Sequence, residues 1–365
     1  MPSKRLRRLF AHIDPTLMAL LGLLLLVSAV IVYSATGASS ARIGSHLMNI
    51  GVALIAMIMV SHIAPQRFMQ LALPAYALGL VLLLGVAVFG VVVNGSRRWL
   101  DIGITRIQPS ELMRLAVPMM LAWYLHYRQD NRSARDFVVA ALMLIVPVAL
   151  IAKQPDLGTA LLITASGFYV LYLGGLSWKV MLGGVVSVGA ALPLVWSYLL
   201  HDYQRQRVLT LIDPSSDPLG AGYHIIQATI AVGSGGVSGK GWLQGTQAHL
   251  DFLPERSTDF IFAVFAEEFG LIGNLLLLLL YGAIIWRGMA LAASAPSLFG
   301  RLFAGAVVLN FFTYAFVNMG MVSGILPVVG VPLPLVSYGG TSMLSVLVGL
   351  GVVMSAASHR KLVNT

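Results

Sequence analysis

The sequence predicts an all-α protein, a bundle of ten transmembrane helices, and three observations carry this prediction. Of the 365 residues, 58% are hydrophobic and only 10% are charged, whereas soluble domains average about 25% charged residues. Ten apolar segments approach the roughly 20 residues that a helix needs to cross a bilayer. None alternates with a period of two, as barrel strands do. Because a backbone in lipid must bond internally, these segments are expected to be helices.

The ten predicted spans are joined by short connections, except for one long interval before the eighth span. In that interval, 201–258, the chain is polar and rich in Gly and Pro, and connections of this length are typically functional or disordered. We expect partial order there, with a short amphipathic helix at 223–232 on the membrane surface. No soluble domain is predicted, so residues 1–365 form a single polytopic domain. The predicted spans are 16–34, 47–64, 71–93, 111–127, 137–152, 157–174, 180–200, 260–286, 302–320 and 342–357.

The distribution of basic residues predicts the orientation of the bundle. With the N-terminus inside, more than half of the 23 Lys and Arg residues fall on the cytoplasmic side, in agreement with the positive-inside rule. Both termini are therefore expected in the cytoplasm, and the interval 201–258 on the outer face. This asymmetry accounts for the net charge of +9 without a nucleic-acid partner. The short outer connections hold few basic residues: Arg42, Arg97, Arg98, Arg106 and Lys153.

Several familiar catalytic motifs fail in this sequence. The run GSGGVSGKG (233–241) is similar to a phosphate-binding loop, but Ser234 and Gly241 stand where that loop requires Gly and Ser or Thr. No HExxH zinc motif occurs among the eight histidines. The nucleophile elbow that begins at Gly236 is interrupted by Lys240. Chemistry driven by ATP, by a zinc protease motif or by a serine triad is therefore not expected.

Acidic residues mark the outer ends of three predicted spans. The fourth, sixth, eighth and tenth spans run from outside to inside, and the first three of these begin near Glu111, Asp156 and Asp259. The tenth follows LVSYGGTS (335–342), where two glycines permit close backbone approach. Helix N-termini attract anions, phosphates especially. With the cations on the same side, these helix starts predict a diphosphate site lined by Arg97, Arg98, Arg106, Arg114 and Lys153.

These residues also have purely structural interpretations. In IQPSEL (107–112) and KQPDLG (153–158) an acid follows Pro closely, which is typical of a helix start. Glu111 and Arg114 lie three residues apart on one helix face, so the two side chains are expected to pair whether or not they also bind substrate. For Asp156 and Asp259, the alternative role is that of a helix cap.

The segment FLPERSTDFIFAVFAEEFG (252–270) raises a separate question, since it places three carboxylates at or within an apolar span. Glu267 lies eight residues beyond Asp259, about 12 Å along a helix, so the two do not form a close carboxylate pair. We expect Glu267 and Glu268 to be structural, bonded to neighbouring helices. Asp259 lies at the water–lipid boundary, within reach of the outer leaflet, and is the functional candidate.

Four segments of the chain occur in a characteristic order. They are RRWLDIGITRIQPSELMRLA (97–116), KQPDLGTAL (153–161), LPERSTDFIFAVFAEEFG (253–270) and PLPLVSYGGTSML (332–344). Together they resemble the SEDS family of bacterial cell-wall polymerases, over nearly the whole chain. The resemblance is closest to the elongation-type members, with the division-type members as the alternative. It implies a ten-helix peptidoglycan glycosyltransferase of the bacterial cytoplasmic membrane, which polymerises lipid II at the outer face, inverts the anomeric carbon and releases undecaprenyl diphosphate.

By matching positions, the resemblance implies a catalytic role for Asp259. A carboxylate there suits the chemistry, because an acceptor hydroxyl must lose its proton as it attacks the anomeric carbon. The chain departs from the family at Arg114, where Lys is common, and Arg does not donate a proton near neutral pH. The predicted substrate-binding residues are Arg97, Arg98, Glu111, Arg114, Lys153, Asp156, Asp251, Glu255 and Ser337.

The resemblance also implies partners. The family works with a class B penicillin-binding protein, a transpeptidase, and with other membrane proteins of the elongation complex. NLLLLLLYGAIIW (274–286) is apolar all round and suggests the eighth and ninth spans as the docking face, with lipid as the alternative contact. No cofactor is fixed by the motifs, and Mg²⁺ or Mn²⁺ is the candidate metal. A lipid II flippase and a scaffold without chemistry are the alternative functions, although the intramembrane charges cluster at the outer end.

Overall fold

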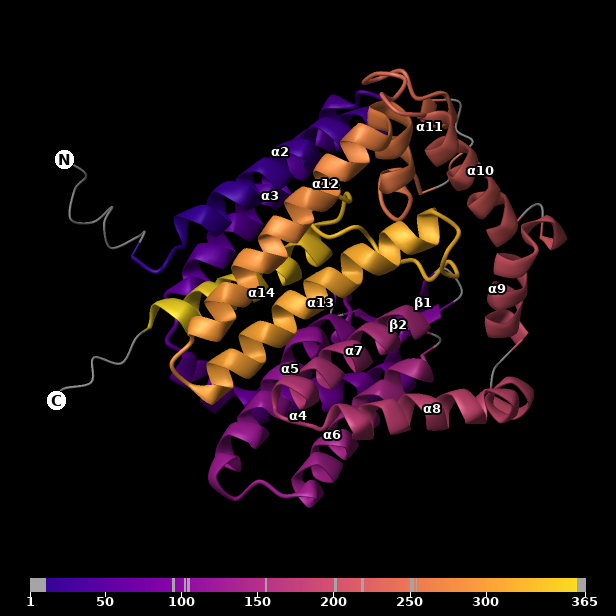
Figure 1. Ribbon diagram of the computed structural model, residues 1–365. Coiled ribbons are helices and arrows are strands. Elements are labelled where there is room, and N and C mark those ends of the chain that lie inside the picture. Colours follow the sequence, from indigo (N-terminus) through magenta and orange to yellow (C-terminus); the bar gives the residue numbers. More distant parts are fainter. Residues whose placement is uncertain are drawn as a thin grey trace, which may run out of the picture.

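The computed structural model describes residues 11–93, 96–101, 103, 106–154, 156–199, 202–217, 220–249, 253 and 255–359. It is mostly helical, as predicted (Figure 1). Within this part of the chain, seven helices are long and apolar enough to cross a membrane. They are α2 (Pro15–Ala35), α3 (Ser40–Ser61), α4 (Pro65–Phe89), α6 (Ala134–Ala152), α12 (Ile261–Ser294), α13 (Leu298–Val322) and α14 (Gly340–Ser358).

Three more helices fall on the remaining predicted spans. α5 (Pro109–Tyr127) carries Glu111 in its first turn. α7 (Leu157–Leu173) and α8 (Trp178–Leu194) have 17 residues each, and a π-helical turn, Val195–Leu199, continues α8. Each of the ten predicted spans therefore overlaps one helix of the described chain. α8 lies at the edge of the bundle, and most of its described side chains are exposed.

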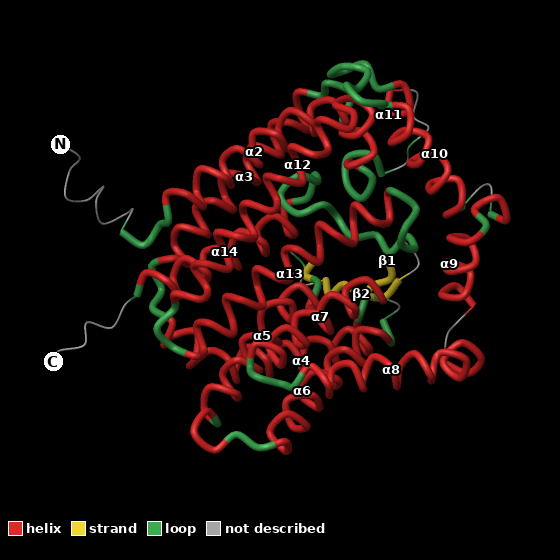
Figure 2. Tube along the Cα trace, viewed as in Figure 1, coloured by secondary structure: helices red, strands yellow, loops and turns green. Residues whose placement is uncertain are grey.

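Buried apolar side chains form two large clusters that share α13 and α14, and Figure 2 shows these two helices between α3 and α5. One cluster joins α2, α3 and α12 to these two helices, and the other joins α4, α5, α6 and α7 to them. At one end of the bundle, Arg287 of α12 is paired with Asp14, the N-cap of α2, at 2.5 Å between Nη2 and Oδ2. His12 Nδ1 lies 3.0 Å from the Ser358 hydroxyl of α14. The first and last described segments thus meet at the same end.

A small sheet at the opposite end corrects the all-α prediction. β1 (Val91–Val93), β2 (Ser96–Asp101) and β3 (Arg106–Ile107) form a three-stranded antiparallel sheet in the order β1-β2-β3. The predicted span 71–93 is wrong at its end, because α4 stops at Phe89. The three valines that follow are β-branched, and such side chains favour an extended strand.

The interval 201–258 contains more helix than the sequence predicted. A helix at the expected position is confirmed as α10 (Ala221–Ser234), within which the predicted residues lie, and its place on the membrane surface stays a prediction. α9 (Asp202–Ile212), a 3-10 turn (Pro214–Ser216) and the short α11 (Thr246–His249) were not predicted. In Figure 1, α9 and α10 run along one side of the bundle, between the end of α8 and the start of α12.

Candidate active site

A cavity of about 380 Å³ lies at the end of the bundle that carries the sheet. Its walls come from β2, from the first turns of α5, α7 and α14, from the turn before α12 and from the segment 330–339. These elements are distant in sequence, and the helix starts among them are those that the sequence placed at the outer face. The cavity brings together six of the predicted site residues: Arg98, Glu111, Arg114, Asp156, Asp259 and Ser337.

Of the other four predicted residues, two do not line this cavity and two have side chains outside the described part of the chain. Lys153 is the C-cap of α6 and is exposed. Glu255 is also exposed, and its carboxylate accepts a hydrogen bond from the Thr258 hydroxyl at 2.8 Å. Asp251 and the side chain of Arg97 lie outside the described residues, although the Arg97 backbone pairs with Val92 in the sheet.

Asp156 combines both roles that the sequence left open. Its Oδ1 caps α7 by accepting from the Thr159 amide at 3.2 Å. The same oxygen lies 3.6 Å from Arg98 Nη1, and Oδ2 accepts from the Gln108 side chain at 3.2 Å. Since Asp156 is only 5% exposed, this carboxylate also holds Arg98 at the wall of the cavity.

Arg114 is held from two sides. Its Nη1 donates to Glu111 Oε2 at 2.8 Å, so the predicted pair is confirmed, and Ser345 donates to the same oxygen at 3.2 Å. The guanidinium carbon of Arg114 lies 5.0 Å from the centre of the Tyr314 ring, within the range of a cation–π contact. The Arg114 cation is therefore placed at the cavity wall by Glu111 and Tyr314 together.

Asp259 is the carboxylate that remains unpaired in the cavity. It does not cap α12, whose N-cap is Phe260, and its carboxylate accepts no hydrogen bond from the described residues. Burial raises the pKa of Asp259 to about 6, and the negative charge of Glu255 adds to this effect. Its backbone is fixed from α13, where the Asn318 side chain donates to the carbonyls of Asp259 and Val331, each at 2.7 Å.

The turn that carries Asp259 is tied to the segment 330–339. The Ser337 hydroxyl donates to the Thr258 carbonyl at 2.6 Å and accepts from the Leu333 amide at 2.8 Å. The Tyr338 amide donates to the Ser257 carbonyl at 2.8 Å. Ser337 therefore positions the turn before Asp259, and its direct binding of substrate stays a prediction.

The helix behind Asp259 is broken at Gly270, and the outer connection is inserted into the break. Gly270 has φ 64° and ψ −162°. The amides of Lys240 and Gly241 donate to the carbonyls of Glu267 and Glu268, each at 3.0 Å. Beyond the break, the amides of residues 271 and 272 donate to the carbonyls of residues 236 and 237 at 2.9 and 3.1 Å. The glycine-rich run that failed as a phosphate loop thus completes the hydrogen bonding of α12.

The two acids inside α12 are structural, as predicted. Glu267 is fully buried and accepts from Lys240 Nζ at 2.6 Å and from the Thr246 amide at 2.9 Å. Glu268, 1% exposed, accepts from the Ser34 hydroxyl of α2. The Glu267 partners belong to the outer connection rather than to a neighbouring helix, because the break in α12 admits that connection.

Sequence reasoning did not single out Gln108, Asn318 or Tyr314, although all three support the site. Gln108 was visible within the IQPSEL motif. Asn318 is buried within an apolar helix, and a polar group in such a helix is itself a functional signal. Tyr314 had no comparable signal, since aromatic residues are common in membrane helices.

Comparison with known proteins shows similarity to one family over most of the chain. The FtsW/RodA/SpoVE family model, described as cell cycle protein, matches residues 9–362. Peptidoglycan glycosyltransferase MrdB of Escherichia coli K12 is 50% identical over 353 residues, which cover 97% of this chain and 95% of that protein.

Solved structures agree on the fold. A chain from a peptidoglycan synthase complex, studied for its coordination of polymerization and crosslinking, superposes with a TM-score of 0.81 at 36% identity, covering 94% of this chain and 96% of its own. The crystal structure of the rod shape determining protein RodA of Thermus thermophilus superposes with a TM-score of 0.71 at 29% identity, covering 95% and 97%. These matches and the apolar helices of the chain identify it as a multi-pass protein of the cytoplasmic membrane. The chain belongs to the FtsW/RodA/SpoVE family, the SEDS family that its four motifs resemble.

Proposed function

We propose that this chain is a peptidoglycan glycosyltransferase of the elongation type, which polymerises lipid II into glycan strands at the outer face of the cytoplasmic membrane. The observation that carries the proposal is an unpaired carboxylate, Asp259, in one cavity with two arginines that are already held in place. The similarity to MrdB and RodA supports the elongation type over the division type.

Asp259 acts as the general base. The acceptor's C4 hydroxyl gives its proton to the carboxylate while its oxygen bonds to the anomeric carbon of the donor. The bond from that carbon to the diphosphate breaks, and the configuration inverts from α to β. A base with a pKa of about 6 is ionised at neutral pH and remains basic enough to share the proton in the transition state.

The departing diphosphate gains negative charge, which the cavity is built to stabilise. Arg98 and Arg114 both line it, and the N-termini of α7 and α14 open into it through Asp156, Thr159 and Thr341. Cations and helix N-termini fixed before the reaction stabilise such charge without reorganisation. The energy comes from the leaving group, so ATP is not needed.

The cavity residues do not fit a resident divalent metal. Asp156 and Glu111 are each committed to an arginine, which leaves Asp259 as the unpaired carboxylate among the described lining residues. No cluster of three His, Asp or Glu ligands occurs in the described part of the chain. The reaction proposed above therefore uses no Mg²⁺ or Mn²⁺ held by the protein. If activity requires either ion, the ion would enter with the substrate, as a counterion of its diphosphate. Measuring polymer formation with EDTA and with added Mg²⁺ or Mn²⁺ tests this.

Neutralising Arg98 should weaken substrate binding more than it disturbs the fold. In Arg98→Gln we expect the affinity for lipid II to fall roughly tenfold, because a hydrogen-bonded cation to an anionic ligand contributes about 1.5–3 kcal/mol. Binding of labelled lipid II to purified protein measures this, with melting temperature recorded alongside. Arg42→Gln, at an exposed arginine that does not line the cavity, is the matched control. Unchanged affinity in Arg98→Gln would remove this residue from the site.

The membrane topology follows from the same assignment. We infer that α2, α3, α4, α5, α6, α7, α8, α12, α13 and α14 all cross the membrane, with both termini in the cytoplasm. An even number of crossings agrees with the contact between His12, in the N-terminal segment, and Ser358 at the end of α14. Residues 271–294 of α12 alone are long enough for the ~30 Å apolar core. Labelling of single cysteines at exposed positions in 202–217 from the outside tests the orientation.

The partner is a class B penicillin-binding protein, whose membrane helix we place against α12 and α13. An apolar groove of about 510 Å³ runs between these helices, lined by Phe262, Leu278 and Phe316 among others. The similarity to a chain of a peptidoglycan synthase complex supports a partner of this kind. Cysteine crosslinking between this groove and the partner's membrane helix tests the placement.

Polymer formation from lipid II in detergent is the decisive test of the function. Purified protein, together with its partner, should convert lipid II into glycan strands that lysozyme digests. Detergent removes the two compartments that a flippase needs, so a transporter or scaffold would yield no polymer. Loss of rod shape with continued septum formation on depletion would support the elongation type, whereas filamentous cells would indicate the division type.

A further inference from the structure

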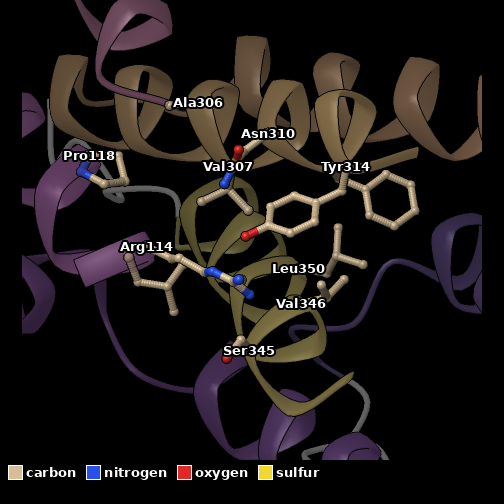
Figure 3. A pocket seen from close by; sticks show the side chains of 12 residues that line it. Arg114, Pro118, Ala306, Val307, Asn310, Tyr314, Ser345, Val346 and Leu350 are labelled. Atoms are coloured by element: carbon tan, nitrogen blue, oxygen red, sulfur yellow. The ribbon is translucent and has the colours of Figure 1, made fainter. Parts of the chain in front are cut away.

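A second, smaller cavity lies directly behind Arg114. It measures about 40 Å³ and is lined by residues of α5, α13 and α14 (Figure 3). Arg114 lines both this cavity and the larger one, so its side chain is common to both. The remaining walls are mostly apolar, and include Pro118, Val307 and Leu350.

Three polar atoms around the small cavity have no hydrogen-bond partner in the described structure. They are the Tyr314 hydroxyl, Asn310 Oδ1 and Arg114 Nε. Tyr314 is only 3% exposed, and Asn310 lies one turn before it on the same face of α13. In Figure 3 the Tyr314 hydroxyl points toward the Arg114 guanidinium. A buried donor or acceptor without a partner costs about 1–3 kcal/mol, so three around one cavity call for a common partner.

The cavity has the size and chemistry for water. One buried water needs roughly 10–15 Å³ of such space and two to four polar partners. A space of about 40 Å³ therefore holds about three or four. Arg114 Nε donates, Asn310 Oδ1 accepts and the Tyr314 hydroxyl does both, so water molecules in this space have a matching group at each of the three residues.

We propose that this cavity is an internal water site, and that Tyr314, acting through it and through its ring, is a positioning residue for Arg114. The ring faces the guanidinium at 5.0 Å, Glu111 fixes Nη1 at 2.8 Å, and water in the cavity fixes Nε. With these three contacts the guanidinium plane has one orientation toward the larger cavity. The inference rests on the proposed function, in which Arg114 meets the diphosphate as it leaves.

Such a role predicts a specific kinetic signature. The charge on the diphosphate grows in the transition state, so a misplaced Arg114 lowers kcat more than it raises KM. Tyr314→Phe keeps the ring and removes the hydroxyl, and kcat should fall roughly tenfold, the effect of one hydrogen bond to a charged group. Tyr172→Phe makes the same change at an exposed hydroxyl of α7 and should leave kcat unchanged.

A double-mutant cycle separates positioning from a general packing defect. Arg114→Lys replaces the guanidinium and its Nε–H, so in that background Tyr314→Phe should change kcat by less than roughly twofold. Asn310→Ala removes another water partner and should repeat the fall in kcat, with Asn310→Ser restoring part of it. A high-resolution map of the wild-type protein should show water density between Tyr314, Asn310 and Arg114.

The outcomes keep the two proposals apart. Wild-type protein that makes no polymer with its partner contradicts the proposed function. Active wild-type protein, with Tyr314→Phe and Asn310→Ala both at the wild-type kcat, overturns the positioning role. Equal effects of Tyr314→Phe in the wild-type and Arg114→Lys backgrounds overturn it as well. A dry cavity in the high-resolution map overturns the water site.

Discussion

Asp259→Asn should abolish glycan polymerisation while leaving the protein folded and inserted. The amide keeps the size of the side chain but does not accept the acceptor's proton, and loss of general-base catalysis lowers rates by roughly 10²–10⁴-fold. Polymer formation from lipid II by purified protein with its partner measures the loss, and lipid II binding should change little. A variant that polymerises at the wild-type rate would exclude Asp259 as the base.

The same substitution should not destabilise the protein. Because burial raises the pKa of Asp259 from 3.8 to about 6, the folded state binds more protons than the unfolded state between about pH 4 and 6. Stability from this group is therefore lost as pH rises through that window, and the ionised carboxylate is a cost at neutral pH. Asp259→Asn removes this cost, so its melting temperature at pH 7 should equal or exceed that of wild type.

The pH dependence of the wild-type rate provides an independent check. Activity should fall as pH drops below about 6, where Asp259 becomes protonated. Glu255→Gln removes the neighbouring negative charge that helps to raise this pKa, so the acidic limb of the profile should move to lower pH. A limb that stays in place in Glu255→Gln would show that another group controls it.

Much of the bundle could be predicted because its signals are local. A run of apolar residues reports its own length, and each of the ten predicted spans overlaps a helix. The Glu111–Arg114 pair was accessible for the same reason, since three residues on one helix fix the geometry. The sheet was missed although Asn94-Gly95, a typical hairpin-turn sequence, follows the valines of β1. Those valines are equally compatible with the end of an apolar membrane span and with a strand.

The contacts that complete the site are long-range, and no local pattern reports them. Asp156 was recognised as a helix start, but its pairing with Arg98 depends on β2 lying beside α7. Lys153 belongs to the same motif, yet it is exposed at the end of α6. It lies only three residues before the buried Asp156, so the motif alone did not show which side chain faces the cavity. Tyr314 reaches Arg114 only because α13 packs on α5.

The break in α12 depends on a contact with a segment distant in sequence, and it also requires glycine at the break itself. Gly270 has a backbone conformation that is essentially restricted to glycine, and an added Cβ would lie 2.3 Å from the Gly239 amide nitrogen. Gly239 is equally crowded, since its Cβ would lie 2.1 Å from the Glu268 carbonyl oxygen. The inserted connection therefore needs glycine on both sides, which explains a glycine-rich run that binds no nucleotide.

Gly270→Ala should consequently cause the largest loss of stability among single methyl additions to this helix. We expect a loss of about 3 kcal/mol or more, because relief of the strain and the clash requires the inserted connection to leave and unpairs the hydrogen bonds that bridge the break. Thermal unfolding in detergent measures the change, and residues 235–249 should become sensitive to protease. Activity should fall too, since residues 261–269 carry the turn of Asp259.

Gly282→Ala is the matched control, because it adds the same methyl group to the same helix at an exposed position with nothing within 4 Å. There the substitution should be neutral or stabilise by up to about 1 kcal/mol, the difference in helix propensity between the two residues. If Gly270→Ala unfolded at the same temperature as Gly282→Ala, the inserted connection would contribute nothing to stability. Asp259 would then owe its position to Asn318 and Ser337 alone, and the glycine-rich run would need another explanation.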